Sequence, residues 1–579
     1  MEKISPIFKW PRPFPGGGVV VVLALLWVAL LCGEARSQIT PEGRDRTYKQ
    51  AAPGRFEKRF EKPSAPRSTV VPVKPETLKP VFPPGLKEGK FTLRKLVIRG
   101  STIFNRITFA SMFRKILRKE VTLEHIYRVA NAITTRYRNQ GYILSKAVIP
   151  PQKIENGRVR IEIIEGYIDK VLVQGKVRGP KRLLNAYRKN ILASKPLHAK
   201  DLERYLLLMD DLPGVTVKSV LTPSEKPGAT NLTIILENKS FDANAGIDNR
   251  GSKFNGPIQL FGGANANSLM GGYERTGVSG VVTSDPDELM YFGGFYEMPV
   301  SAEGTKLFFS GSVSESAPGS SLEEFEVEGE SSSVQLLFSH PFIRSRGENL
   351  NAHFGFTSRD SKTDILGTTD SEDRLRVLDL GASYDFADRH QGVNVVSLNL
   401  LRGLNVFNTT ETGSDNLSRE QGVSDFTKIT GEVLRLQQLA PSWMLLGSVS
   451  WQYSFDKLLS SEEFGFGGPR FGRGFDSSEI TGDSGISLKL ELQKAFRVNK
   501  KYFQGLQIYG FYDYGSVWNR VQTSTIEKRQ GRYSIGLGGR FNLTKEFSGY
   551  VEIAKPLADR VSSEGNRDPR VFFGFTARY

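Results

Sequence analysis

Cysteine is almost absent from this chain, which has one, Cys32, among 579 residues. A mature protein without that residue forms no disulfide and offers no thiolate ligand for zinc. Histidine is also scarce, with five residues, and none stands in the sequence context that a catalytic serine needs. We therefore expect no catalytic residue, no metal and no cofactor in this chain.

Long apolar runs are missing too, apart from one near the N-terminus. A basic stretch over residues 1–17 is followed by an apolar run over 19–32 and by small residues at Ala35 and Ser37. This order predicts a signal peptide over residues 1–37. The run is shorter than the roughly 20 residues of a membrane helix, so an N-terminal anchor is the weaker alternative. The lack of any other such run excludes helical membrane spans but leaves a β-barrel open, because barrel strands are only half apolar.

Charge is distributed unevenly along the rest of the chain. Residues 38–240 contain 40 Lys and Arg against 18 Asp and Glu, a net charge of +22. Residues 241–579 contain 34 against 42, a net charge of −8, and most of the aromatic residues. The chain thus divides into a basic arm and an acidic body. Because no nucleic-acid-binding motif accompanies the arm, we expect no nucleic-acid partner.

The first part of the arm, residues 38–90, is predicted to be a basic, proline-rich linker. Prolines recur between 63 and 84 at intervals too short for a helix, which favours an extended chain. Upstream, residues 55–62 are long enough for about two helical turns.

Two similar units follow, over residues 91–166 and 167–240. Each is predicted to run strand, helix, helix, strand, strand. The first unit has predicted strands at 91–98, 142–149 and 159–164, and helices at 107–117 and 123–137. The second has predicted strands at 167–173, 215–221 and 231–236, and helices at 181–192 and 199–209. These two βααββ units form an internal repeat, and small units of this kind more often present a sheet edge to a peptide than a catalytic site.

Strict alternation of apolar and polar residues dominates residues 241–579. In one segment Tyr533, Ile535 and Leu537 share one parity, while Ser534 and Arg540 share the other. A soluble β-sandwich alternates in the same way. The predicted signal peptide, strands of about ten residues and a terminal aromatic favour a transmembrane antiparallel β-barrel of about 16 strands.

Several short motifs carry a family resemblance. They are Tyr137, Gly141-Tyr142, Pro150, Gln152-Lys153-Ile154, Gly157 and Glu165-Gly166 in the first unit, Asp201-Leu202-Glu203-Arg204 and Asp211-Leu212-Pro213-Gly214-Val215 in the second, and His340-Pro341-Phe342-Ile343-Arg344-Ser345-Arg346 and Ala554-Lys555-Pro556-Leu557 in the barrel. On these residues the chain resembles the two-partner secretion transporters, the TpsB or haemolysin-activator type of the outer-membrane POTRA–barrel superfamily. The resemblance implies that the two units are POTRA domains. It also implies that the linker contains a helix, within residues 38–62, that plugs the barrel at rest.

The most specific motif is Gly468-Pro469-Arg470-Phe471-Gly472-Arg473-Gly474-Phe475, which resembles the family's VRG(Y/F) loop with Gly472 in place of valine. The resemblance implies that this loop folds back into the barrel, where Arg473 pairs with an aspartate at the position of Asp513. The alternation around Ile508 and Tyr512 independently directs Asp513 into the lumen. We expect Gly474 to permit the tight loop tip, and Phe475 completes the motif. The alternative for Arg473 is an exposed loop arginine.

Two further motifs need separate interpretation. Gly482-Asp483-Ser484-Gly485 matches the nucleophile signature of trypsin-like proteases, but no histidine in a suitable context accompanies it, so we expect no enzyme. Phe575 and Tyr579 end the last predicted strand. They are either lipid-facing aromatics of an interface girdle or, as the resemblance implies, a C-terminal signal that the barrel-assembly machinery recognises.

Together these observations predict a protein of the bacterial outer membrane with POTRA domains in the periplasm. Its expected function is to capture an unfolded partner polypeptide in the periplasm and to secrete it through the barrel. The basic arm is expected to attract acidic segments of that partner. An outer-membrane protein insertase of the same superfamily is one alternative, and a passive porin is another. The expected partners are the secreted polypeptide, the barrel-assembly machinery and outer-membrane lipid.

Overall fold

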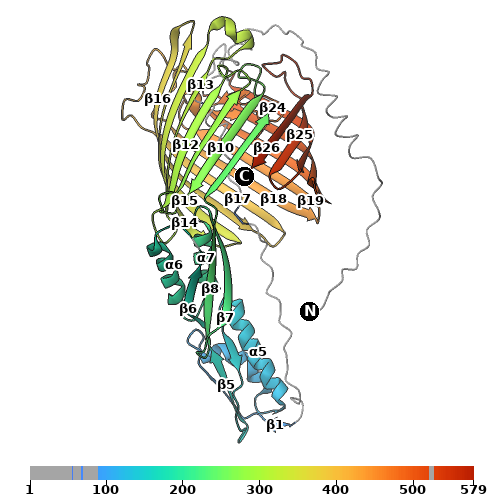
Figure 1. Cartoon of the computed structure of the whole chain (residues 1–579). Helices are drawn as coiled ribbons and strands as arrows, with labels where there is room; N and C mark the ends of the chain where they lie inside the picture. Colours follow the sequence, from blue (N-terminus) through green and yellow to red (C-terminus); the bar gives the residue numbers. More distant parts are fainter. Residues whose placement is uncertain (1–54, 56–66, 69–88, 176, 521–526) are drawn as a thin grey trace.

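The computed structural model describes residues 55, 67–68, 89–175, 177–520 and 527–579. The predicted signal peptide and most of the linker, including its predicted helix except for Arg55, lie outside these residues. In the described part, a β-barrel stands on an arm of two α+β units (Figure 1). No helix among the described residues is both long and apolar enough to cross a membrane.

The first unit packs two helices against a three-stranded sheet. Its elements are β1 (Phe91–Thr92), β2 (Lys95–Arg99), α4 (Arg106–Phe113) with a 3-10 turn (Arg114–Ile116), β3 (Glu120–Val121), α5 (Leu123–Asn139), β4 (Lys146–Val148) and β5 (Arg158–Ile164). The Asn105 side chain caps α4 by accepting a hydrogen bond from the Thr108 amide. One apolar face of α5 supplies buried residues such as Ile126 and Ile133 to the core.

Two predicted strands of this unit are shorter than expected. The strand predicted over 91–98 is split, because Leu93 turns its side chain into the core between β1 and β2. The strand predicted over 142–149 is limited to β4, because residues 142–145 form a turn in which the Ser145 amide donates to the Tyr142 carbonyl. Apolar residues in such a turn reach the core without joining the sheet, so their pattern resembles that of a strand.

The second unit repeats the order β6 (Tyr167–Gln174), α6 (Lys181–Ala193), α7 (Ala199–Asp210), β7 (Val215–Pro223) and β8 (Ala229–Asn238). Its sheet has the order β6-β8-β7, so β7 lies at an edge. The two units meet closely, because the Ala199 amide donates to the Gly141 carbonyl and the Leu197 amide to the Gly166 carbonyl.

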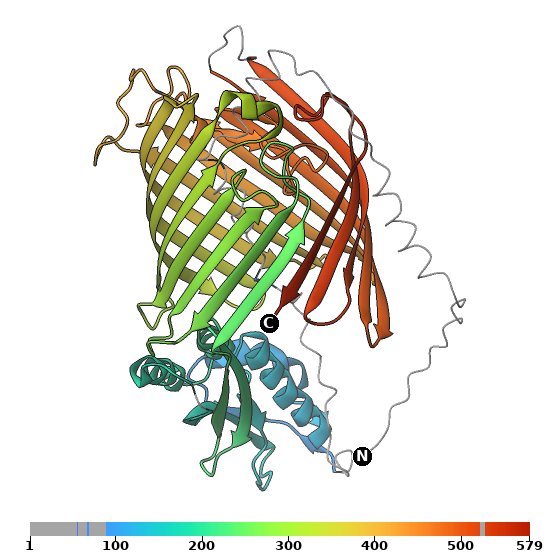
Figure 2. The same ribbon diagram turned by 45° about the horizontal axis from the view of Figure 1, so that its top comes forward.

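The barrel is closed and has 16 antiparallel strands, which confirms the predicted fold class. They are β9 (Phe241–Asp248), β10 (Gln259–Asn267), β11 (Arg275–Thr283), β12 (Met290–Pro299), β13 (Lys306–Ser316), β14 (Glu328–Arg344), β15 (Glu348–Ile365), β16 (Thr368–Ala387), β17 (Gly392–Gly403), β18 (Thr427–Ala440), β19 (Trp443–Ser454), β22 (Ser484–Lys500), β23 (Phe503–Trp518), β24 (Arg529–Asn542), β25 (Phe547–Pro556) and β26 (Arg570–Arg578). The alternation has the predicted sense: on β24 Leu537 is 68% exposed on the outer wall, whereas Ser534 is fully buried inside. Figure 2 shows the strong tilt of the strands.

The seam between the last and the first strand has the shortest ladder in the barrel. β26 and β9 share five residue pairs, whereas β9 and β10 share eight. Beyond β9 the side chain of Asn249 continues the ladder: its Nδ2 donates to the Val571 carbonyl at 2.9 Å, and its Oδ1 accepts from the Phe573 amide at 2.7 Å. A single amide side chain thus replaces a peptide unit at this end of the seam.

The second unit is seated firmly on the adjacent rim of the barrel, here called the arm-side rim. Tyr273, in the turn between β10 and β11, is fully buried in the core of that unit. Its ring occupies the space that a Cβ at Gly179 would fill. In addition, Arg344 at the end of β14 pairs with Asp211, which follows α7.

Candidate functional site

The candidate site is a long loop, residues 455–483, that joins β19 to β22 and lies inside the barrel. It contains a small hairpin of β20 (Phe464–Phe466) and β21 (Ile480–Gly482). At its turns Gly467, Gly468 and Gly472 have φ angles of +126°, +90° and +85°, a region that L side chains rarely adopt. The glycine-rich sequence therefore lets the loop reverse direction within the restricted lumen.

At the tip of this loop Arg473 contacts Asp513 on the inner face of β23. Its Nε and Nη2 atoms donate to the two carboxylate oxygens at 2.9 Å each, and its backbone amide donates to Oδ2, also at 2.9 Å. The two side chains are 2% and 0% exposed. The guanidinium also lies 3.5 Å from the centre of the Phe511 ring. This is a bidentate, charge-assisted contact in a desolvated place, where a single remaining charge is costly.

Further buried charges surround this pair, and the sequence reasoning missed them. Glu491 on β22 accepts from Arg473 Nη1 and from Arg540, and Glu552 on β25 lies 3.6 Å from the same Nη1. Glu552 in turn accepts from Arg250, which follows the seam residue Asn249. Three arginines thus meet three carboxylates, and Lys489 on β22, which lies opposite Asp513 in the ladder, adds one further positive charge. The alternation of the sequence already directs Glu491 into the lumen. A charge buried there needs a partner of opposite charge, which was the signal available in the sequence.

The glycines of the motif have different roles from those expected. No positive φ is found at Gly474; a Cβ there would lie 2.8 Å from the Ser534 Cβ and 3.1 Å from the Pro556 nitrogen. Gly474 therefore allows close approach to the wall. The left-handed conformation belongs to Gly472, where a Cβ would also lie 2.7 Å from the Phe466 ring, so this tip has no room for valine. Phe475 is buried in a small apolar cluster beside it.

A second set of ion pairs anchors the start of the loop. Glu462 pairs with Arg359 on β15 at 2.7 Å and with Lys428 on β18 at 2.6 Å. The adjacent Glu463 pairs with Arg419, in the loop between β17 and β18, and with Arg55 of the N-terminal segment. All these side chains are at most 10% exposed. The loop is thus attached to the barrel wall at its start as well as at its tip.

The protease-like residues take part in the same structure. Asp483 is fully buried and pairs with Arg419, and its carboxylate also accepts from the Leu458 amide. The Ser484 hydroxyl accepts from the Ser454 amide at 3.1 Å. Asp483 therefore holds both ends of the loop together.

The predicted C-terminal residues lie on the outside of the barrel. Phe575 is 44% exposed and Tyr579 is 77% exposed. The Tyr579 amide donates to the Ala243 carbonyl at 2.8 Å, which extends the seam ladder. Lys239 donates to the Tyr579 carbonyl at 2.9 Å, so the C-terminus lies at the arm-side rim.

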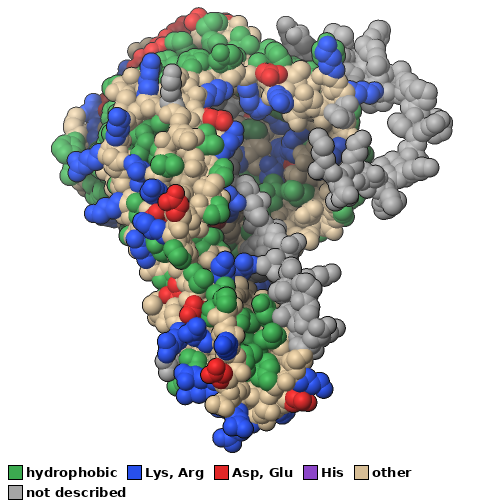
Figure 3. Space-filling model, turned by 60° about the horizontal axis from the view of Figure 1, so that its bottom comes forward, with side chains coloured by type: hydrophobic (Ala, Val, Ile, Leu, Met, Phe, Trp, Pro, Cys, Tyr) green, Lys and Arg blue, Asp and Glu red, His purple; other side chains and the backbone are tan. Residues whose placement is uncertain are grey.

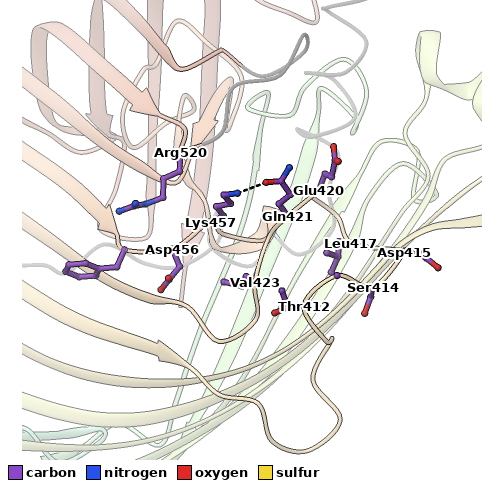
Figure 4. Close-up of a pocket in the computed structure, with 12 residues that line it drawn as sticks. Thr412, Ser414, Asp415, Leu417, Glu420, Gln421, Val423, Asp456, Lys457 and Arg520 are labelled. Atoms are coloured by element: carbon purple, nitrogen blue, oxygen red, sulfur yellow. Dashed lines mark hydrogen bonds between the residues drawn. The ribbon is translucent and has the colours of Figure 1, made fainter.

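Two cavities flank the loop. A luminal cavity of about 1100 Å³ is lined by wall residues together with Arg55, Arg67 and the loop residues Glu462 and Glu463. Figure 3 views the barrel from the arm side and shows this hollow with Lys and Arg side chains around it. At the far rim a second pocket, of about 820 Å³, lies among three loops, and there Lys457 donates to Gln421 (Figure 4).

This chain is similar in sequence to known protein families and to individual proteins. The profile described as haemolysin secretion/activation protein ShlB/FhaC/HecB matches residues 229–540, and the ShlB-type POTRA profile matches residues 91–166. The heme/hemopexin transporter protein HuxB of Haemophilus influenzae (strain 86-028NP) is 24% identical over 82% of this chain and 86% of its own length. The outer membrane transporter CdiB of Dickeya dadantii is 25% identical over 69% and 72%.

A solved structure with a similar fold is CdiB from Escherichia coli, with a TM-score of 0.70 and 20% identity over 94% of this chain and 100% of that chain. The predicted localisation and function are confirmed at the level of the family, whose members are transporters of partner proteins rather than enzymes. The arm-side rim is accordingly the periplasmic one. On the extent of the family match, this chain belongs to the ShlB/FhaC/HecB family and is an outer-membrane transporter of two-partner secretion.

Proposed function

We propose that this transporter captures one unfolded partner polypeptide with its POTRA-like units and passes it through the barrel lumen to the outside. The observation that supports this most is the loop 455–483, which stands outside the ladder of the barrel wall and is held in the lumen by buried ion pairs and by its two ends. Ion pairs can break and re-form without unfolding of the barrel, whereas a strand of the wall cannot leave without opening the ladder.

Capture by strand addition is the proposed first step. β7 lies at the edge of the second sheet and has six consecutive exposed residues at its C-terminal end. An extended polypeptide can hydrogen-bond to such an edge through its backbone with little regard to sequence. The basic arm adds an attraction for acidic segments of the partner, which weakens as salt is added.

The pairing of Arg473 with Asp513 is proposed to act as the lock of the loop. The lock holds the loop tip against β23 at rest, and displacement of the tip widens the path for the partner. For the C-terminal residues Phe575 and Tyr579 we propose recognition by the barrel-assembly machinery, since both are accessible from outside the barrel.

Residues 38–62 are proposed to occupy the lumen at rest. The support is Arg55, whose side chain is 7% exposed and pairs with Glu463 of the loop. Deletion of residues 38–62 is expected to raise ion conductance in planar bilayers, and so is Arg55→Glu, which sets two like charges side by side. Lys189→Glu, a charge reversal at an exposed position of α6 outside the barrel, is the control. Unchanged ion conductance after the deletion and after Arg55→Glu contradicts the proposal that residues 38–62 plug the barrel.

The test of secretion is removal of this chain from its cell, followed by analysis of the culture medium and of the outer membrane. Loss of one secreted polypeptide, with other outer-membrane proteins intact, supports the proposal. General loss of outer-membrane proteins instead supports an insertase, and loss of small-solute uptake alone supports a porin.

A further inference from the structure

The periplasmic mouth of the barrel contains a continuous polar relay that the transport cycle described above does not use. It begins at Asp211, directly after α7 of the second POTRA-like unit. Arg344 at the end of β14 donates to both of its carboxylate oxygens, from Nε at 2.7 Å and from Nη2 at 2.8 Å. The side chains of Arg344 and Asp211 are 9% and 21% exposed. This bidentate geometry fixes direction as well as distance.

The third nitrogen of the same guanidinium continues the relay inside the barrel. Arg344 Nη1 donates to Asn349 Oδ1 at 3.0 Å, and Asn349 Nδ2 donates to Asp385 Oδ2 on β16 at 2.9 Å. Asn349 and Asp385 are 4% and 7% exposed. The Asn349 amide is therefore oriented by a donor on one side and an acceptor on the other.

The relay ends on the N-terminal segment. Ser68 is 2% exposed, its backbone amide donates to Asp385 Oδ2 at 2.9 Å, and its hydroxyl donates to the same oxygen. Asn349 Nδ2 also lies 3.3 Å from the Ser68 hydroxyl. One carboxylate oxygen thus accepts hydrogen bonds both from the barrel wall and from a segment more than 300 residues away in sequence.

Further contacts join the second unit to the same part of the rim. Arg204 of α7 donates to the Pro341 carbonyl at 3.2 Å, and the Arg346 amide donates to Glu203 at 3.0 Å. Together with Asp211 and Arg344, these residues belong to the three sequence motifs at 201–204, 211–215 and 340–346, which are distant in sequence and meet here. Because Arg344 donates hydrogen bonds to both Asp211 and Asn349, it connects the second unit to the inner wall of the barrel.

We propose that Arg344 is a positioning residue for transport: it seats the second POTRA-like unit on the barrel and, through Asn349 and Asp385, holds Ser68 at the same mouth. Displacement of the unit when the partner binds then weakens the hydrogen bonds that hold Ser68. The displacement by a bound partner rests on the proposed function. The coupling between the second unit and Ser68 does not, and it can be measured without any partner.

The coupling is tested by spin-label distances in the full chain. In a Cys32→Ser background, two introduced cysteines are the only labelling sites, since the chain has one cysteine. One pair, Lys189→Cys with Lys545→Cys, measures the distance between the second unit and the barrel. A second pair, Arg67→Cys with Lys545→Cys, measures the distance between the position next to Ser68 and the barrel. All three positions are exposed.

Asp211→Asn, a nearly isosteric change outside the barrel, is expected to broaden the distance distributions of both pairs. Arg344→Ala is expected to do the same, with Arg389→Ala, an exposed arginine in the turn between β16 and β17, as the control that broadens neither. Asp385→Asn is expected to broaden the second pair. A second pair that stays narrow in Asp211→Asn and Arg344→Ala overturns the coupling, even if the first pair broadens.

Secretion supplies the separate readout. Asp211→Asn is expected to lower export roughly tenfold, the factor that the loss of a charge-assisted hydrogen bond produces in an equilibrium. Arg389→Ala is expected to leave export unchanged. If the wild-type chain exports no polypeptide, the proposed function fails, and the distance measurements still decide the coupling.

Discussion

Arg473 and Asp513 are 40 positions apart and are joined by three hydrogen bonds of 2.9 Å, one of them from the Arg473 backbone amide. Because of this backbone contact, Asp513 fixes the position of the loop backbone as well as the Arg473 side chain. The lock thus combines a buried ion pair with a fixed backbone geometry.

Replacement of either partner of this pair is the first prediction. Arg473→Ala or Asp513→Ala leaves an opposite charge buried without its partner, which costs about 3–5 kcal/mol. Each change is expected to abolish most secretion while the barrel stays folded, as judged by its heat-modifiable migration in gels. The double change is expected to destabilise the resting loop by less than the sum of the two. Arg470→Ala is the control, because its ion pair with Glu432 leaves the arginine side chain 45% exposed and such exposed pairs contribute little. Wild-type secretion from both single changes contradicts the role of the lock.

The seam residue Asn249 supports a second prediction. Asn249→Ala removes two hydrogen bonds, of 2.7 and 2.9 Å, between the first and last strands, and leaves their partners on β26 unpaired. The free energy of unfolding is expected to fall by about 1–3 kcal/mol, measured by urea denaturation of the folded barrel in detergent. Asn542→Ala, an exposed asparagine on β24, is the control. An equal effect of both changes refutes a special role of the seam residue.

The joint between the two POTRA-like units gives a third prediction. Gly141 has a φ of +91°, and a Cβ there would lie 2.5 Å from the His198 Nε2 atom. Gly141→Ala therefore adds a steric clash to a backbone strain of about 1–2 kcal/mol. Faster hydrogen exchange is expected at Leu197 and Ala199, whose amides bridge the units. Gly413→Ala is the matched control, because Gly413 has a φ of +86° with open space around it. Unchanged exchange in Gly141→Ala contradicts the assignment of this joint.

Glu165 in the first unit gives a pH prediction. Burial alone would raise the pKa of Glu165, but hydrogen bonds from Thr102, Tyr137 and the Ile103 amide outweigh it and lower the pKa below its ordinary value of 4.5. The stabilisation is therefore fully present above that value and is lost as the pH falls through the lowered pKa. Hydrogen exchange at Thr102 and Ile103, corrected for intrinsic rates, is expected to increase over that acidic range in the wild type. In Glu165→Gln it is expected to be insensitive to pH there. Equal pH dependence of the two proteins rules out this role of the carboxylate.

Much of the architecture could be predicted because barrel strands obey a period of two. The outward parity of Ile508 and Tyr512 was enough to direct Asp513 inward, where it is fully buried. The repeat of βααββ units was visible in the same way, since helices and strands have different apolar periods. The predicted ends of strands were less accurate where a turn contributes apolar residues to the core, as residues 142–145 do.

The partners of the lock could not be predicted from such a pattern. Alternation shows that Glu491 and Glu552 face inward. It does not show which luminal side chains lie at the same height along the barrel axis and can therefore contact each other. Arg250 reaches Glu552 across the seam, over 302 positions of sequence. The spatial order of β25, β26 and β9 is set by closure of the barrel, which leaves no local signal in the sequence.

The central claim is that a polypeptide passes through this lumen, and site-specific photo-crosslinking in living cells tests it most directly. A photoreactive residue at Asn399 faces the luminal cavity, whereas one at the adjacent Leu398, which is 52% exposed, faces lipid. We predict that the exported polypeptide is crosslinked from position 399 and not from position 398. No crosslink from 399, or equal crosslinking from both positions while secretion continues, would contradict it.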